Sequence, residues 1–439
     1  MKTTDLSVSK GPRSLLFSVY DQLRGGKVKK HLAELELLSK MDDEAEIEER
    51  HRNLFRDLMN EVSEHVPAYR QYSGSVKLTD MPVLKKDELK ANYNQYFSGR
   101  YTREDLIEAK TSGSYGTPFS FYMTKERKAR QQAEIIHFGK LSGYQVGQKH
   151  AYVRSTVKSS LKLWLQNELL ISPSIVNDEF LSEKRKKLIE SECELIIGYP
   201  TVIANIASYC LSVGDTPSIF SVKGVITTSE PLTEQARATI ENCFGVKVLS
   251  RYSSEELGVV GQERGEPGLH LTNHFTHIVE VLELNSDKRC EPGKVGRVVV
   301  TDLYNRAFPL IRYDTGDLAE YVPASKNRYG LPAIKNLQGR TIEVIYTVKG
   351  ETITPMAING VFRDCEDSDN IIQYQFIQES SSDYKLLLQL VKEELNTVPI
   401  IENLKSMLGS DAAITIDFVD HIPPLKSGKR PYIVNRYKK

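Results

Sequence analysis

Residues 194–228 read ELIIGYPTVIANIASYCLSVGDTPSIFSVKGVITT, with two short apolar runs, ELIIG and GVITT, on either side of a longer helix-like segment at 201–213. The pattern continues through a second helix-like segment at 232–244 and the apolar runs VKVLS and RVVVT. Short apolar runs that alternate with helical segments are typical of a sheet covered by helices. This stretch therefore predicts an α/β fold with a largely parallel sheet.

The length and charge of the chain indicate a multidomain protein that acts on a small substrate. At about 150 residues per domain, 439 residues correspond to two or three domains. The 58 Lys and Arg residues equal the 58 Asp and Glu residues, so no net charge attracts nucleic acid or an anionic membrane. From about residue 339 the predicted elements become shorter and the chain ends in a basic tail. We predict a large domain over residues 1–338 and a small α+β domain over residues 339–439.

The chain shows no sign of secretion or of a membrane span. No stretch approaches the roughly 20 apolar residues that cross a bilayer, and the first 30 residues hold no continuous apolar segment, so we expect a cytoplasmic protein. The five cysteines are scattered and never spaced as C-x-x-C. This indicates reduced thiols rather than a disulfide framework or a zinc site.

The segment KTSGSYGTP at residues 110–118 has the composition of a phosphate-binding loop. Glycines let backbone N–H groups approach an anion, and the hydroxyl groups donate further hydrogen bonds to phosphate oxygens. The spacing of a Walker loop is absent, and Ser114 does not lie in a G-x-S-x-G elbow. A plain Ser/Gly turn is the alternative interpretation.

Five further segments follow in order: SEP at 229–231, RYSSEELG at 251–258, RYDTGDL at 312–318, GRTIEV at 339–344 and SGKRP at 427–431. In this order and at these separations, the chain resembles the phenylacetate-CoA ligase family of the adenylate-forming superfamily. The resemblance is strongest to the branch associated with capsular-polysaccharide biosynthesis, and it runs from about Leu78 to the C-terminus. It implies a large adenylating domain with mixed or parallel sheets and a mobile C-terminal domain.

The resemblance implies a role for each matching residue. Tyr252 corresponds to the aromatic residue that stacks on adenine, and Glu256 to the carboxylate that holds Mg²⁺, a cation that prefers oxygen ligands. The other implied nucleotide contacts are the phosphate loop (Thr111, Ser112, Gly113, Ser114, Gly116, Thr117), the adenine and acyl-pocket segment (Ser229, Glu230, Pro231), the ribose-binding Asp317, and Arg340 at the domain junction.

Three of these assignments leave an alternative open. Glu255 lies beside Glu256 and replaces the usual hydroxyl residue of the family, although the spacing to Gly258 favours Glu256. Asp317 also fits a turn-capping residue in a T-G-D loop. Lys429 corresponds to the lysine that bridges the substrate carboxylate and the α-phosphate, where a cation would meet the charge on phosphorus. The alternative for Lys429 is a solvated basic tail.

His270, His274 and His277 share the spacing of one helical face, which is a pattern seen in metal sites. The H-E-x-x-H glutamate is absent, and the family has a strand at this position. We therefore expect structural or substrate-lining histidines and no zinc.

The resemblance implies ATP-dependent formation of an acyl-AMP, with Lys429 and Glu256 as the catalytic residues, followed by acyl transfer. ATP or AMP and Mg²⁺ are the implied cofactors. A small carboxylic acid and coenzyme A are the leading substrates, and an amine or sugar acceptor is the alternative. A non-catalytic nucleotide-binding protein on the same fold is a more distant alternative. Related ligases are often dimers, so a homodimer also remains open.

Overall fold

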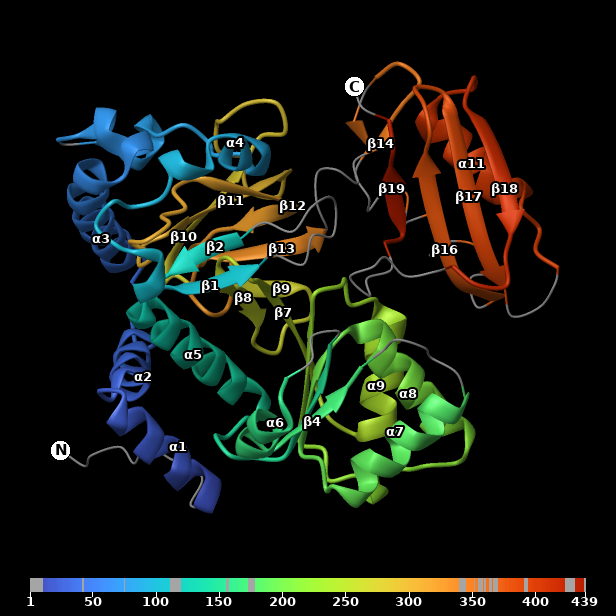
Figure 1. Cartoon of the computed structure of the whole chain (residues 1–439). Helices are drawn as coiled ribbons and strands as arrows, with labels where there is room; N and C mark the ends of the chain where they lie inside the picture. The colour runs from blue at the N-terminus through green and yellow to red at the C-terminus, as the bar shows by residue number, and fades with distance from the viewer. Residues whose placement is uncertain are drawn as a thin grey trace. The chain divides into compact units, whose positions relative to one another are not determined.

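The computed structural model describes residues 11–41, 43–74, 76–110, 120–154, 158–172, 178–338, 345–350, 352–353, 358, 361–362, 365, 370–390, 394–422 and 431–437. The chain forms two compact units (Figure 1). The first contains residues 1–315 and 319–337, and the second contains residues 316–318 and 338–439.

The described part of the first unit contains long and short helices. The α-helices are α1 (Pro12–Leu23), α2 (Lys27–Leu38), α3 (Glu44–His65), α4 (Lys86–Ala91), α5 (Lys125–Gly139), α6 (Ser160–Gln166), α7 (Asp178–Glu190), α8 (Pro200–Ser212) and α9 (Glu234–Phe244). The 3-10 helices are η1 (Pro67–Tyr72), η2 (Leu78–Asp80), η3 (Tyr93–Gln95), η4 (Arg103–Asp105), η5 (Lys140–Ser142), η6 (Pro217–Ile219) and η7 (Ala324–Lys326).

The main sheet contains eleven strands among the described residues. Their order across the sheet is β10 (His277–Leu282), β11 (Val295–Asp302), β12 (Tyr313–Val322), β13 (Ala333–Gln338), β9 (Leu269–Thr272), β8 (Gly258–Glu263), β7 (Val248–Ser254), β6 (Gly224–Thr228), β5 (Leu195–Gly198), β3 (His150–Val153) and β4 (Glu168–Ile171). A separate antiparallel pair joins β1 (Ile107–Lys110) to β2 (Ser120–Met123).

The sheet changes strand direction in its middle. Strands β4, β3, β5, β6 and β7 are parallel, whereas β8 is antiparallel to β7 and β9 is antiparallel to β8. The prediction of a mixed α/β fold is therefore confirmed. The run RVVVT, however, lies in β11, which pairs antiparallel with β10. A continuous apolar run indicates burial on both faces and does not report strand direction.

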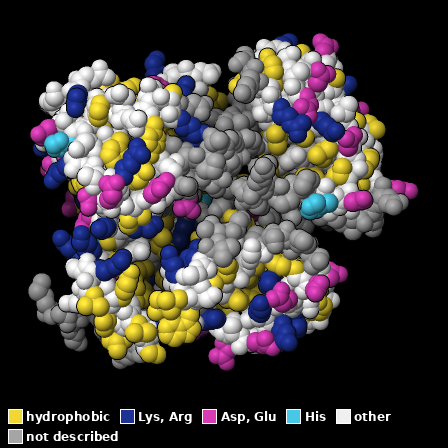
Figure 2. Space-filling model, viewed as in Figure 1, with side chains coloured by type: hydrophobic (Ala, Val, Ile, Leu, Met, Phe, Trp, Pro, Cys, Tyr) yellow, Lys and Arg dark blue, Asp and Glu magenta, His cyan; other side chains and the backbone are white. Residues whose placement is uncertain are grey.

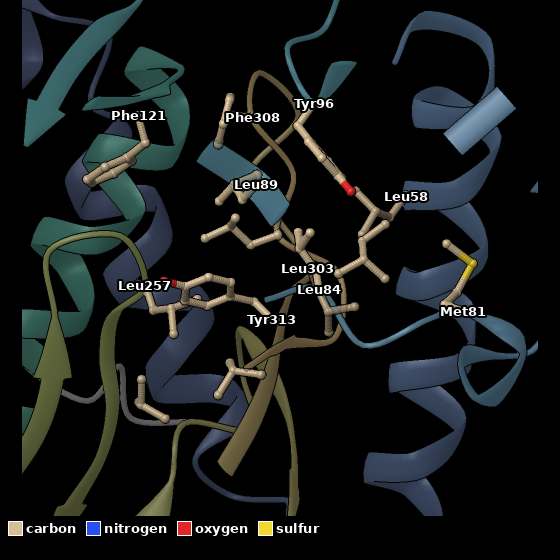
Figure 3. Packing of buried hydrophobic residues seen from close by; sticks show 14 of the residues in the cluster. Leu58, Met81, Leu84, Leu89, Tyr96, Phe121, Leu257, Leu303, Phe308 and Tyr313 are labelled. Atoms are coloured by element: carbon tan, nitrogen blue, oxygen red, sulfur yellow. The ribbon is translucent and has the colours of Figure 1, made fainter. Parts of the chain in front are cut away.

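Helix α3 shows how local sequence sets an element. Asp43 caps its first turn by accepting a hydrogen bond from the Ala45 amide at 2.9 Å, and the chain leaves the helix at Val66, just before Pro67. Proline disfavours the helical conformation in the residue before it. The buried face of the helix packs into the largest core of the first unit, which also contains Phe308 and Tyr313 (Figure 3).

The two faces of the parallel strands are covered by different helices. Residues of α7, α8 and α9 form one core with β3, β5, β6 and β7, including Leu188, Val202 and Ile240. On the other face, Leu195, Ile197 and Ile226 pack with Tyr144 and Tyr152. Helix α5 packs against β8 and α2.

The second unit contains a four-stranded sheet in the order β18 (Ala413–Phe418), β17 (Asp383–Leu390), β16 (Ile371–Gln378) and β19 (Ile433–Asn435). A short pair, β14 (Ile345–Tyr346) and β15 (Thr352–Ile353), and helix α11 (Val398–Leu408) complete its described elements. The apolar residues Phe376, Leu386 and Leu404 pack in a core of its own.

The surface agrees with the balanced composition. Figure 2 shows Lys and Arg side chains interspersed with Asp and Glu side chains over the visible face. Within the described residues, no helix has both the length and the apolar character needed to cross a membrane.

Candidate active site

The carboxyl ends of the parallel strands bring polar residues together. Arg154 follows β3, Tyr199 follows β5, Ser229 follows β6 and Glu255 follows β7. Open α/β sheets bind ligands beyond the carboxyl ends of their parallel strands. This edge of the sheet is therefore the place where the predicted site residues of the first unit should meet.

Two backbone features shape this edge. A Cβ added to Gly198 would lie 2.2 Å from the carbonyl oxygen of Val153, so the ends of β5 and β3 approach as closely as they do only because this residue is glycine. Ser229 has a φ of 73°, in the left-handed region that non-glycine residues rarely adopt. Such outliers cluster at functional sites.

The segment Ser229–Glu230–Pro231 is tied to the start of α8. The Thr201 hydroxyl donates a hydrogen bond of 2.7 Å to Oε2 of Glu230, and the Thr201 amide donates a longer one of 3.4 Å to the same oxygen. A carboxylate is favoured at a helix N-terminus, where the first amides lack partners within the helix. The loop after β6 is therefore held to the element that follows β5.

The turn between β7 and β8 carries the candidate metal ligand. Glu256 is buried, and its Oε1 accepts a hydrogen bond of 3.3 Å from the Tyr313 hydroxyl on β12. Glu255 is exposed on the same turn. Four residues before Glu256, the Tyr252 hydroxyl donates a hydrogen bond of 3.1 Å to Oγ1 of Thr315, also on β12. Strand β12 is thus hydrogen-bonded to β7 through Thr315 and Tyr252, and to the turn after β7 through Tyr313 and Glu256.

A buried ionic network centred on α5 holds the turn between β7 and β8 in place. Arg127 on α5 donates to Asp302 at 2.8 Å, to Glu134 at 3.3 Å and to the carbonyl oxygen of Leu257 at 2.8 Å. Buried charges need such partners because desolvation of an unpaired charge is costly. Burial raises the pKa of Glu134, although its arginine neighbours act in the opposite direction. The carbonyl contact fixes the residue that follows Glu256.

The sequence did not reveal this network, because its members lie far apart along the chain. Arg127 and Asp302 are separated by 175 positions, and no local pattern links them. Tyr313 and Thr315 stand within the RYDTGDL segment that carries Asp317, so their place in the motif was visible although their partners were not.

The remaining predicted site residues fall into two groups. Asp317 lies on β12, two residues beyond Thr315 and directly after Gly316, whose φ is 75°. The second group lies outside the described residues: Thr111, Ser112, Gly113, Ser114, Gly116, Thr117, Arg340 and Lys429.

The three histidines have separate surroundings. His270 on β9 lies 3.1 Å from the Ser250 hydroxyl through Nε2, and His274 lies 3.3 Å from the Thr272 carbonyl oxygen through Nδ1. His277 begins β10, and burial lowers its pKa to about 3. Among the described residues, no group of three His, Cys, Asp or Glu side chains is placed to hold a metal ion.

Comparisons with known proteins agree with this geometry. Residues 345–436 match the CapK C-terminal domain family. Protein CapK of Staphylococcus aureus is 26% identical over 377 residues, which cover 82% of this chain and 81% of that protein. A phenylacetate-coenzyme A ligase of Thermus thermophilus is 26% identical over 351 residues, covering 75% of this chain and 77% of that protein. The chain is thus similar to protein CapK and to phenylacetate-coenzyme A ligases.

Solved structures share the fold of this chain. A 2-hydroxyisobutyryl-CoA ligase in its postadenylation state superposes with a TM-score of 0.69 at 15% identity, and the match covers 91% of each chain. ATP-bound MatB from Rhodopseudomonas palustris superposes with a TM-score of 0.56 at 16% identity, covering 75% of this chain and 67% of that chain. The large mixed sheet and the smaller C-terminal unit of the enzyme thus follow an arrangement found in other ligases.

Proposed function

We propose that the enzyme activates a carboxylic acid with ATP and transfers the acyl group to coenzyme A. In the first half-reaction, a carboxylate oxygen attacks the α-phosphorus and the bond to the β-phosphate breaks, giving acyl-AMP and pyrophosphate. In the second, the thiol sulfur attacks the acyl carbonyl, AMP leaves, and the thiol proton is released. Positioning and charge stabilisation supply most of the rate in reactions at phosphorus.

The observation that carries this proposal is the position of Glu256. A buried carboxylate with one oxygen hydrogen-bonded to Tyr313 stands beyond the carboxyl end of β7, and Ser229, with its positive φ, follows the neighbouring strand β6. Relatives named phenylacetate-coenzyme A ligases support a carboxylic acid and coenzyme A as the substrates.

The donor set at Glu256 fits a magnesium ion. Mg²⁺ is commonly held by one or two carboxylates together with substrate phosphates. Glu256 would be the protein ligand, and the exposed Glu255 does not offer a comparable buried oxygen. When bound, the ion would neutralise charge on the phosphates. The hydrogen bond from Tyr313 keeps the Glu256 side chain oriented.

The proposal assigns the predicted roles to the remaining residues. The loop at 111–117 would hold the β- and γ-phosphates, Asp317 the ribose hydroxyls, and Arg340 the nucleotide. Lys429 on the C-terminal domain would act in the first half-reaction and be withdrawn for the second. The 2-hydroxyisobutyryl-CoA ligase has been solved in a postadenylation state, an open conformation and a thioesterification state, which supports such a change of state.

Exchange of radiolabelled pyrophosphate into ATP tests the first half-reaction. A panel of acids is screened with ATP and Mg²⁺, and hydroxylamine traps each acyl-AMP as a hydroxamate for mass spectrometry. Acid-dependent exchange is expected, and Lys429→Ala is expected to abolish it. If no acid in a broad panel supports pyrophosphate exchange, the proposal is contradicted. ATP binding without AMP release, unchanged by Lys429→Ala, would instead support a non-catalytic nucleotide-binding protein.

The acceptor is tested separately with the acid that the first assay identifies. Coenzyme A, simple amines and amino sugars are offered to the preformed acyl-AMP, and the product is identified by mass. A thioester is expected. An amide or ester formed in preference to the thioester would move the proposal to an amine or sugar acceptor and leave the first half-reaction intact.

A further inference from the structure

Arg251 is a buried cation without an acidic partner among the described residues. It lies on β7 with only 7% of its surface exposed, and its one assigned side-chain hydrogen bond joins Nε to Oε1 of Gln262 at 2.7 Å. Its Nη2 is buried and has no hydrogen-bond partner in the described part of the chain. Burial lowers the pKa of Arg251 to about 10. An arginine fork with a free buried nitrogen is suited to an oxygen anion.

The other buried arginines show how unusual this is. Arg312 donates to both oxygens of Glu280 at 3.1 Å, and Arg127 pairs with Asp302 and Glu134. Buried charges in proteins are normally paired in this way, because desolvation penalises an isolated charge. The fold therefore maintains Arg251 at a cost that the described residues around it do not offset.

Two aromatic side chains lie beside Arg251 on its face of the sheet. Tyr144 and Tyr152 are both partly exposed and lie near its guanidinium group. The rings pack against the apolar side chains of Leu195, Ile197 and Ile226 on neighbouring strands. Apolar and aromatic side chains therefore lie on the same face of the sheet as the Arg251 cation, a combination that suits a short carbon chain ending in an anion.

The buried carboxylate of Glu168, on the edge strand β4, is engaged by other cations. Glu168 accepts hydrogen bonds from Lys158 at 2.7 Å and from Arg154, whose guanidinium carbon lies 4.4 Å from the centre of the Tyr152 ring. Despite its burial, Glu168 has a pKa lowered to about 2, because His150 and Lys158 donate hydrogen bonds to it. Glu168 is thus paired with its own cations, and no ion pair joins it to Arg251 among the described residues.

Arg251 also points away from the predicted nucleotide side of its strand. Successive side chains on a strand lie on opposite faces, and the next residue, Tyr252, joins the core that contains Tyr313. Arg251 lies on the face of Tyr152 and Gln262, and Gln262 donates in turn to the Phe138 carbonyl oxygen of α5 at 2.8 Å. The free guanidinium nitrogen therefore lies on the face of β7 opposite Tyr252, the residue expected to stack on adenine.

We propose that Arg251 binds a second carboxylate of the acid that the enzyme activates, so that the preferred substrates are short dicarboxylic acids. This inference rests on the proposed function. It identifies Arg251 as a specificity-determining residue: one carboxylate of the substrate would lie at the reacting phosphorus, and the carbon chain would run along the wall formed by Tyr144 and Tyr152.

Pyrophosphate exchange with matched acids tests this proposal. Dicarboxylic acids and monocarboxylic acids of equal chain length are compared with the wild-type enzyme and with Arg251→Met. The wild type is expected to favour the dicarboxylic acids in kcat/KM by about 10- to 100-fold, the value of a charged hydrogen bond. Arg251→Met should remove this preference by raising the KM for the dicarboxylic acid while the KM for ATP stays within about twofold.

Two further variants separate binding from folding. Arg251→Lys keeps the cation and should retain part of the preference, and Arg289→Met removes an exposed arginine and should retain all of it. Dicarboxylic acids should also raise the melting temperature of the wild type but not that of Arg251→Met. Equal activation of the two acid classes, or an effect of Arg251→Met on the KM for ATP alone, overturns the inference. If none of the acids supports pyrophosphate exchange, the result counts against the proposed function itself.

Discussion

The hydroxyl of Tyr313 donates a hydrogen bond of 3.3 Å to the buried carboxylate of Glu256. The two residues are 57 positions apart and lie on β12 and on the turn between β7 and β8. This contact orients one carboxylate oxygen within the protein. The contact and the burial of Glu256 also distinguish it from the neighbouring Glu255, whose side chain is exposed.

The first prediction uses that difference between adjacent residues. Glu256→Gln should lower acid-dependent pyrophosphate exchange by about 100-fold or more, because an amide replaces a charged oxygen ligand for Mg²⁺. Glu255→Gln should change the rate by less than about threefold, since interactions of an exposed side chain are screened by solvent. A larger loss in Glu255→Gln than in Glu256→Gln would move the metal-binding role to Glu255.

A second prediction concerns the hydrogen bond itself. Tyr313→Phe removes the donor to Glu256 but keeps the buried ring, so the exchange rate should fall by about 3- to 10-fold, with a loss of stability of about 1–3 kcal/mol because a buried acceptor loses its donor. The Mg²⁺ concentration needed for half-maximal exchange should be higher for Tyr313→Phe than for the wild type. Tyr384→Phe, in the second unit, removes a hydroxyl bonded to the Tyr346 carbonyl oxygen and serves as the matched control. Equal kinetic effects of the two substitutions would contradict the assigned role of Tyr313.

Arg312 gives a prediction for stability. Arg312→Met leaves Glu280 buried without its two hydrogen bonds, and loss of one partner from a buried pair costs about 3–5 kcal/mol. Urea unfolding measures the change. The double variant Arg312→Met/Glu280→Met removes both charges and should recover much of that loss. A double variant as unstable as the single one would show that the ion pair is not the source of the effect.

Gly198 tests the close approach at the ends of β5 and β3. Gly198→Ala should cost at least about 2 kcal/mol more than Gly143→Ala, because the new Cβ at position 198 would collide with the Val153 backbone. Gly143 also has a positive φ, of 80°, but no atom lies within 4 Å of an added Cβ. Its substitution should cost only about 1–2 kcal/mol from the backbone conformation. Similar losses in thermal or urea unfolding would contradict the steric explanation.

Buried histidines predict a dependence of stability on pH. Burial lowers the pKa of His274 and of His277 from 6.5 to about 3. The unfolded chain binds protons below about pH 6.5 that the folded chain excludes, so the stability present above that pH is lost as the pH falls toward 3. Each histidine contributes a slope of about 1.4 kcal/mol per pH unit within this window.

The variant His277→Asn isolates one of these contributions. The slope of the free energy of unfolding between about pH 6 and about pH 5 should decrease by about 1.4 kcal/mol per pH unit relative to the wild type, because one titrating group is removed. An unaltered slope in His277→Asn would show that His277 takes up its proton equally in both states.

Much of the fold was visible in local patterns. The helix-like segments at 201–213 and 232–244 predicted α8 and α9, and the apolar runs at 194–198 and 224–228 predicted β5 and β6. These features follow from interactions within a few residues. The direction of β11 did not, because it depends on which strand lies beside it, and the run of residues 298–301 fits either direction.

The candidate site divides in the same way. Tyr252 and Glu256 stand in a recognisable motif, but the hydrogen bonds to Thr315 and Tyr313 depend on strands that meet only in the folded chain. The unpaired state of Arg251 was equally invisible. A missing partner can be identified only once the neighbours of a residue are known.

The contact between Arg127 and the Leu257 carbonyl oxygen limits how this scaffold can be recombined with its relatives. A chimera that exchanged α5 alone and did not keep an arginine at position 127 would lose the hydrogen bonds to Asp302 and to the Leu257 carbonyl oxygen. The residue that follows Glu256 would then no longer be held by α5. The segments around residues 125–139, 255–258 and 302 should therefore come from the same parent protein. Crossover points in an engineered hybrid should fall outside all three.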